Sequence, residues 1–224
     1  MFGDHLLLRP WRSGRPSKAV LISVLAISHR FMMDAGVEWA IQAFDSLDPD
    51  DALTPAHRLQ LSFRYDLQQW VLPAVSGLMD GQVARKLLRL ISNDDVEQMG
   101  LRTYILVVKG IETIQAARTS VAIRPPQTHH CPQCRFRDDE QKCNRAWRDF
   151  WLTTVSLIVL APDHPEPLQS LITFLKNADI ANFHDTCKTL TLSHFEETEV
   201  LKIETTVKER VASAIWDLYQ QGLR

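Results

Sequence analysis

Cysteine and histidine residues gather in one short stretch of the chain, and their spacing is the strongest chemical signal in the sequence. The stretch reads His129-His130-Cys131-Pro132-Gln133-Cys134, and Cys143 follows it. Two thiolates separated by two residues can both reach one tetrahedral ion, so the Cys131/Cys134 pair predicts a zinc knuckle. Cys143 is the expected third ligand. The expected fourth ligand is one of the following residues: Cys187, or in its place His129, His130 or His184.

One structural Zn²⁺ bound by Cys131, Cys134, Cys143 and Cys187 would tie the middle of the chain to its C-terminal part and stabilise the fold. The alternative is that the cysteines are free thiols without a metal. A disulfide does not suit the reducing compartment that we expect for this protein. The structural zinc ion is therefore the only cofactor that the sequence predicts.

A zinc-dependent or thiol enzyme centred on Cys131 and Cys134 is a first alternative. A catalytic zinc needs an open coordination position and a carboxylate base, which the acidic run 138–140 could supply. The sequence has no His-Glu-x-x-His motif and no His-x-Glu upstream of a Pro-Cys-x-x-Cys. A thioredoxin-like pair needs a βαβ context, which a helical chain lacks. We therefore expect a protein that is not an enzyme.

A zinc-containing nucleic-acid-binding regulator is a second alternative, because basic residues surround the cysteines. These residues are Arg135, Arg137, Arg145 and Arg148. Asp138, Asp139 and Glu140 lie among them and cancel much of their charge. The whole chain has a formal net charge of -2, which gives no electrostatic footprint for nucleic acid or for an anionic membrane. Neither partner is expected.

The elements that must position these residues are helices. Apolar residues recur at helical spacing along most of the chain, and only 8 glycines are present, which disfavours an all-β fold. Thr54-Pro55 and Ser92 are clear helix starts. One unbroken stripe consists of Leu67, Trp70, Val71, Ala74, Val75 and Leu78, with Pro73 expected to kink it. The predicted fold is all-α, built from antiparallel helix pairs with a Cys-rich loop between two helical halves.

The domain boundaries follow from breaks in these patterns. Residues 1–16 are aperiodic and are expected to be a tail or the remnant of a larger N-terminal domain. Residues 17–118 form the first helical half. A loop with prolines and cysteines, 119–145, is the expected linker. Residues 146–224 form the second half.

Tryptophans on helical stripes are expected to fill the core and to donate the indole N–H to a carbonyl. The three that this concerns are Trp70, Trp147 and Trp151. The longest apolar runs are far shorter than the roughly 20 residues that span a bilayer. The N-terminus does not read as a secretory signal. We therefore expect a location in the cytoplasm or nucleus, with reduced or metal-bound cysteines.

The order of helices resembles the region that follows the BTB/POZ fold in fungal, especially basidiomycete, BTB-domain proteins, a region similar to the BACK helical extension. The segments that carry the resemblance are Ala19–Phe31, Thr54–Leu67, Trp70–Ala74 and Met99–Leu101. The later Cys-x-x-Cys, the Trp147/Trp151 pair and Cys187 also look like the downstream half of those proteins. In that family the BTB fold carries dimerisation and much of the cullin contact, and residues 1–16 are too few to hold it.

The expected function is therefore a non-enzymatic protein–protein interaction module, stabilised by a structural zinc ion. The resemblance implies docking as the mechanism, with paired helices presenting a rigid surface. The expected partners are proteins, including other copies of the same chain. The sequence does not identify them.

Overall fold

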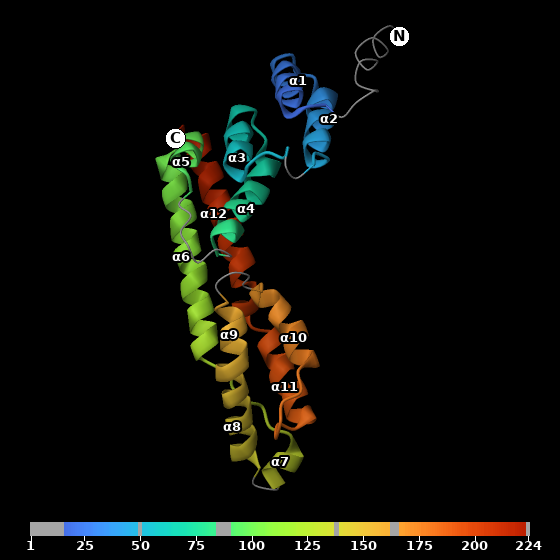
Figure 1. Cartoon of the computed structure of the whole chain (residues 1–224), viewed down its shortest axis with the longest axis vertical. Coiled ribbons are helices and arrows are strands. Elements are labelled where there is room, and N and C mark those ends of the chain that lie inside the picture. Colours follow the sequence, from blue (N-terminus) through green and yellow to red (C-terminus); the bar gives the residue numbers. More distant parts are fainter. Residues whose placement is uncertain (1–15, 49–50, 84–90, 137–138, 162–165, 223–224) are drawn as a thin grey trace. The chain divides into compact units, whose positions relative to one another are not determined.

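The computed structural model describes residues 16–48, 51–83, 91–136, 139–161 and 166–222, and every regular element in these ranges is a helix (Figure 1). The prediction of an all-α fold is confirmed. None of the described helices is both long and apolar enough to cross a membrane. The expected tail, apart from residue 16, lies outside the described residues.

The chain divides into two compact units, Met1–Ala74 and Val75–Arg224. The expected division into 17–118, 119–145 and 146–224 stays a prediction, and the boundary between the two compact units falls between Ala74 and Val75. Within the expected linker, residues 119–123, 132–136 and 140–145 are helical and residues 124–131 are not. The three cysteines of this segment are buried in the core.

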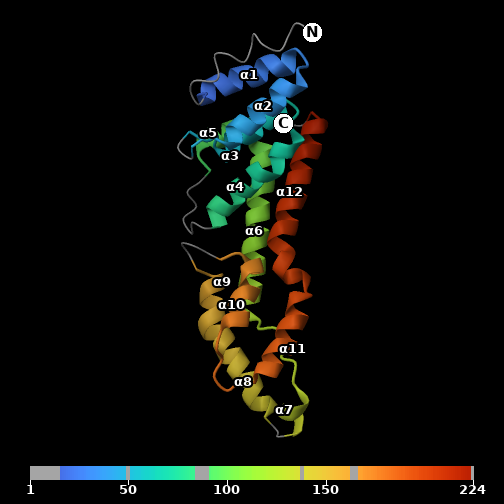
Figure 2. The same ribbon diagram turned by 90° about the vertical axis from the view of Figure 1, so that its right-hand side faces the viewer.

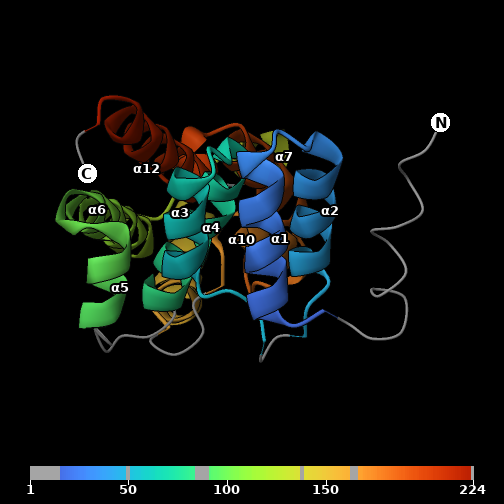
Figure 3. The same cartoon turned by 90° about the horizontal axis from the view of Figure 1, so that it is seen from above.

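The first unit contains α1 (Lys18–Arg30), α2 (Asp34–Asp45), α3 (Pro55–Arg64), η2 (Gln68–Trp70) and the start of α4 (Val71–Val83). The helices α1 and α2 pack side by side as an antiparallel pair (Figure 3). The core of the first unit includes Leu21, Leu25, Ala40 and Phe44 of these two helices and Trp70 of η2.

Two predictions for the first unit can be compared with its local geometry. The Thr54 side chain accepts a hydrogen bond from the His57 N–H at 3.2 Å, which confirms the helix start at Thr54-Pro55. Pro73 lies in the first turn of α4, where a missing N–H costs no helical hydrogen bond, so the structure gives the expected kink no physical basis. Trp70 is 2% exposed, as expected, but its indole N–H has no hydrogen-bond acceptor among the described residues.

The second unit is built on two long helices. The chain enters through α5 (Asn93–Met99) into α6 (Leu101–Ile123), and it ends in α12 (Ile203–Gln220). Figures 1 and 2 show α6 and α12 lying antiparallel along much of their length. Gly110 permits this close approach, because an added Cβ there would lie 2.8 Å from Cγ2 of Val211.

The remaining helices of the second unit pack beside this pair and carry the cysteines. A short helix, α7 (Pro132–Phe136), is followed by a rod made of α8 (Glu140–Phe150), the π-helical turn η3 (Trp151–Val155) and α9 (Ser156–Val159). Then come η4 (Leu168–Ser170), α10 (Leu171–Asn177), α11 (Asp185–Glu196) and η5 (Glu199–Lys202). Figure 1 shows α7, α8 and the start of α11 meeting at one end of this unit.

Candidate metal centre

All four cysteines of the chain meet in the core of the second unit. Cys131 directly precedes α7 and Cys134 lies within it, while Cys143 lies in α8 and Cys187 in the first turn of α11. Each of them is at most 1% exposed, and none forms a disulfide. The Cys134 Sγ atom lies 3.4 Å from that of Cys143 and 3.3 Å from that of Cys187. Helical N-termini therefore bring together thiols that are far apart in sequence.

The donor atoms form two groups of four, and within each group all atoms lie within 4.8 Å of one another. The first group is His130, Cys134, Cys143 and Cys187, and the second is Cys131, Cys134, His184 and Cys187. Either group could hold a metal ion. The expected set of four cysteines is not one of these groups. In each group a histidine stands in for one cysteine.

The distances fit a tetrahedral ion after a small expansion. A zinc–sulfur bond of about 2.3 Å places two thiolates about 3.8 Å apart. The observed sulfur–sulfur distances of 3.3 and 3.4 Å are shorter, so each pair would open by roughly 0.4 Å on binding. His184 approaches in the same way, since its Nδ1 lies 3.0 Å from the Cys134 Sγ.

The two ring nitrogens of His130 differ in their hydrogen bonding. Its Nδ1 atom is buried and has no hydrogen-bond partner among the described residues. Its other ring nitrogen, Nε2, lies 3.2 Å from Oδ1 of Asn144. A metal-bound imidazole commonly donates its second N–H to such an oxygen, which fixes the orientation of the ring. His130 Nδ1 is therefore a candidate ligand atom, with Asn144 positioned to orient the ring.

Hydrogen bonds and burial shift the pKa values of the thiols in opposite directions. The Cys134 backbone N–H and the His184 side chain stabilise the Cys131 thiolate, and they lower its pKa from 9.0 to about 6. Burial and the neighbouring Cys187 raise the pKa of Cys134 well above its ordinary value. Burial also raises the pKa of Cys187, although its sulfur accepts a hydrogen bond from the Cys131 N–H at 3.2 Å. A bound metal ion displaces the protons of its cysteine ligands, so these cysteines would all be thiolates despite their different pKa values.

Aromatic side chains enclose the cysteines. Trp147 stacks on Phe183 with ring centroids 5.3 Å apart, and Trp151 meets Phe195 edge to face at 5.6 Å. The indole N–H of Trp147 donates to the Pro126 carbonyl, and that of Trp151 donates to the Val121 carbonyl. The prediction that these two tryptophans are core residues with a carbonyl partner is confirmed.

His129, the other histidine of the pair, is in neither metal group. Its ring stacks on His194 with centroids 3.9 Å apart, and its backbone N–H donates to Thr191 Oγ1. Desolvation and the neighbouring His194 lower the pKa of His129, which favours the neutral ring in this stack. Adjacent histidines point to different surroundings, so the sequence could not choose between them.

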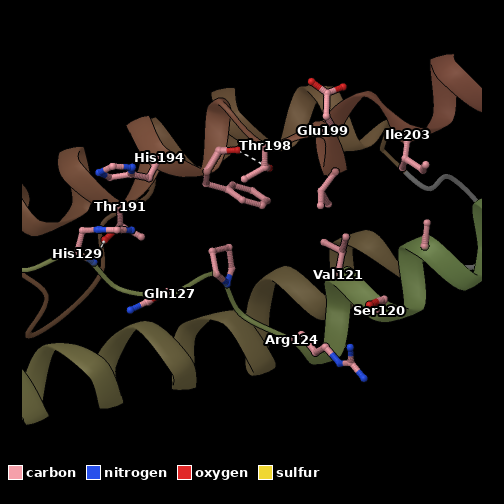
Figure 4. A pocket seen from close by; sticks show the side chains of 14 residues that line it. Ser120, Val121, Arg124, Gln127, His129, Thr191, His194, Thr198, Glu199 and Ile203 are labelled. Atoms are coloured by element: carbon pink, nitrogen blue, oxygen red, sulfur yellow. Dashed lines mark hydrogen bonds between the residues drawn. The ribbon is translucent and has the colours of Figure 1, made fainter.

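His129 and His194 line a cavity of about 640 Å³ that sequence reasoning missed (Figure 4). Its walls come from the end of α6, the segment 126–129, α11, η5 and the start of α12. The apolar lining includes Val121, Pro126, Phe195, Val200 and Ile203. No local motif marks this cavity, because its walls come from two distant stretches of the chain, 117–129 and 191–203.

The charged residues around the cysteines are only partly described. Asp139 forms an ion pair with Lys142 at 2.7 Å, and Arg137 and Asp138 lie outside the described residues. Neither metal group contains a carboxylate. Among the described residues, the acidic run 138–140 therefore supplies no ligand to either metal group.

Comparisons of the chain with models of known protein families, with curated proteins and with solved structures found no match. The resemblance to the post-BTB region of fungal proteins therefore stays a prediction. What the centre can do has to be argued from its own geometry.

Proposed function

We propose that the second unit is a non-enzymatic protein-interaction module held together by structural zinc. One observation carries the proposal: four buried thiols and an imidazole nitrogen without a partner among the described residues converge from α7 and the two residues before it, from α8 and from α11. Thiolate and imidazole donors in a tetrahedral arrangement suit Zn²⁺ better than the harder cations, which prefer oxygen ligands. Reduced cysteines of this kind are typical of the cytoplasm or nucleus.

A structural role is favoured over a catalytic one by the donor set. Each group supplies four protein donors, and a catalytic zinc keeps one position for water or substrate. Each of the four thiols is also at most 1% exposed, which would keep substrates away from the metal. The ion would stabilise the module by joining α11 to α7 and α8.

The proposed interaction site is the cavity between α6, α11 and α12. Its apolar walls and its size suit an apolar segment of a partner protein, and Val200 at its rim is 40% exposed. The partner is a different protein or a second copy of this chain. The role is similar to the one that the fungal BTB resemblance implies.

Metal analysis of the full-length protein tests the first half of this proposal. We expect zinc to copurify with the chain, and we expect a strong chelator to remove it together with much of the helical signal of the second unit. A protein that contains no metal and whose stability does not respond to added Zn²⁺ would contradict the structural role of zinc. A turnover that depends on Cys131 with the fold intact would favour the enzyme alternative, and steeply salt-dependent DNA binding would favour the regulator.

Affinity capture with matched variants tests the second half. Val200→Asp places a charge at the rim of the cavity, whereas Leu157→Asp places the same charge on α9, away from the cavity, at a side chain that is 70% exposed. We expect partners captured by the wild-type chain to be lost with Val200→Asp and kept with Leu157→Asp. Sedimentation of the same proteins reports self-association. Equal capture by both variants would exclude the cavity as the docking site.

A further inference from the structure

The two metal groups share a pair of ligands, and this sharing has a consequence for the number of ions. Cys134 and Cys187 belong to both groups, and their sulfur atoms lie 3.3 Å apart. His130 and Cys143 complete the first group, and Cys131 and His184 complete the second. The six donors exceed the four that one tetrahedral zinc ion takes.

We propose that the centre is binuclear, with two divalent thiophilic ions bridged by the thiolates of Cys134 and Cys187. Two tetrahedra that share one edge have six corners, and six donors are present. Cys143 and His130 Nδ1 are the terminal ligands of one ion. Cys131 and His184 are the terminal ligands of the other. This inference rests on the proposed metal centre and specifies its composition.

Charge balance supports two ions. The four thiolates carry four negative charges, and the imidazoles are neutral when they bind a metal. A single divalent ion bound by either group would be held by three thiolates and one imidazole, which leaves one net negative charge and one unbound cysteine in a core where all four cysteines are at most 1% exposed. Uncompensated buried charge is strongly unfavourable. Two divalent ions make the cluster neutral.

The surroundings of the terminal ligands support two separate ends. At one end, Asn144 holds Nε2 of His130 and leaves its buried Nδ1 without a partner. At the other end, His184 Nδ1 lies 3.0 Å from the Cys134 sulfur, and Cys131 completes the same group of donors. With a single ion, one of these two prepared ends would have no metal to bind.

The bridging residues occupy a position that suits two metals. Cys187 lies in the first turn of α11, where the positive end of the helix dipole stabilises a thiolate. Its sulfur also accepts the Cys131 backbone N–H at 3.2 Å. The Cys134 sulfur lies 3.4 Å from the sulfur of Cys143, at one end, and 3.0 Å from Nδ1 of His184, at the other. A bridging sulfur must have neighbours of this kind on both sides.

Native mass spectrometry of the full-length protein loaded with Zn²⁺, together with elemental analysis, gives the number of ions per chain directly. We expect two. Loading with Co²⁺ gives a second readout that needs no variant, since two bridged Co²⁺ ions couple magnetically. The electron paramagnetic signal should rise with the first equivalent of Co²⁺ and fall with the second.

Substitutions of single ligands test which residues bind each ion. His130→Ala and His184→Ala should each reduce the content from two ions to one, and Cys134→Ser should weaken binding of both. His129→Ala is the matched control, because this residue is next to His130 but belongs to neither group. It should keep two ions.

The outcomes separate this inference from the proposed function. One ion per chain, with an electron paramagnetic signal that does not fall at the second equivalent, would overturn the binuclear cluster and leave the single-zinc module standing. No bound metal would overturn both. Iron with acid-labile sulfide would also overturn the thiolate-bridged pair, because sulfide would then be the bridge.

Discussion

At the scale of single residues, the second unit depends on a buried ion pair as well as on its cysteines. Arg118 Nε of α6 lies 2.6 Å from Oε1 of Glu204 in α12, and the two residues are 86 positions apart. The same guanidinium donates to the carbonyls of Val159 and Glu166. The carboxylate also accepts the Leu168 N–H at 3.3 Å. The Arg118–Glu204 pair therefore joins α6, α9, η4 and α12.

Arg118→Met should destabilise the protein by about 3–5 kcal/mol, because it leaves the buried Glu204 carboxylate without its counter-charge. The double variant with Glu204→Leu should recover much of this loss, since no buried charge then remains. Urea unfolding followed by circular dichroism measures both. A single variant that costs less than about 1 kcal/mol would show that the pair is dispensable.

The affinity for Zn²⁺ should fall as the pH is lowered, because bound thiols must lose their protons. Burial raises the pKa of Cys134 and of Cys187, so both release protons on binding at neutral pH. The pKa of Cys131 is about 6, so this thiol adds a further proton only below that pH and makes the dependence steeper there. Each displaced proton weakens binding about tenfold per pH unit. Chelator competition at several pH values measures the slope, and a flat profile would contradict it.

At the scale of elements, short-range signals define the helix ends. The Ser92 side chain accepts the Asp95 N–H at 3.1 Å, and the Asp95 carboxylate accepts the Ser92 N–H at the same distance, which forms a capping box at the start of α5. Ser92 was predicted to start this helix, and the prediction is confirmed.

Ser92→Ala should cost about 1 kcal/mol, because the first turn of α5 loses its cap. Thr113→Ala is the control, since this exposed hydroxyl only donates back to the Lys109 carbonyl within α6. The control should change the free energy of unfolding by less than about 0.5 kcal/mol. Thermal unfolding of the two variants compares them. An equal loss in both would mean that the capping box contributes no specific stability.

At the scale of the whole molecule, the two units have separate cores, and only the second contains the cysteines. The metal should therefore stabilise one unit and leave the other nearly unchanged. Chelation should speed amide hydrogen exchange in α7, α8 and the first half of α11, with little effect in α1, α2 and α3. Mass spectrometry of peptides before and after chelation measures this difference. Equal acceleration in both units would show that metal loss unfolds the entire chain.

The sequence by itself determined the helical class, several helix ends and the importance of the Cys131/Cys134 pair. These features depend on neighbouring residues: periodic burial, caps such as Thr54 and Ser92, and two thiols two residues apart. The core roles of Trp147 and Trp151 were also predictable, because both lie on one helical stripe.

Only the tertiary structure decided which residues meet. It separated His130 from His129, brought His184 and Cys187 to Cys134, paired Arg118 with Glu204, and placed the boundary of the units between Ala74 and Val75. Such contacts join residues that are distant along the chain, and their selection depends on how whole helices bury their apolar faces. The spacing of residues along the sequence does not specify that packing. It could therefore predict a candidate metal centre but not its ligand groups.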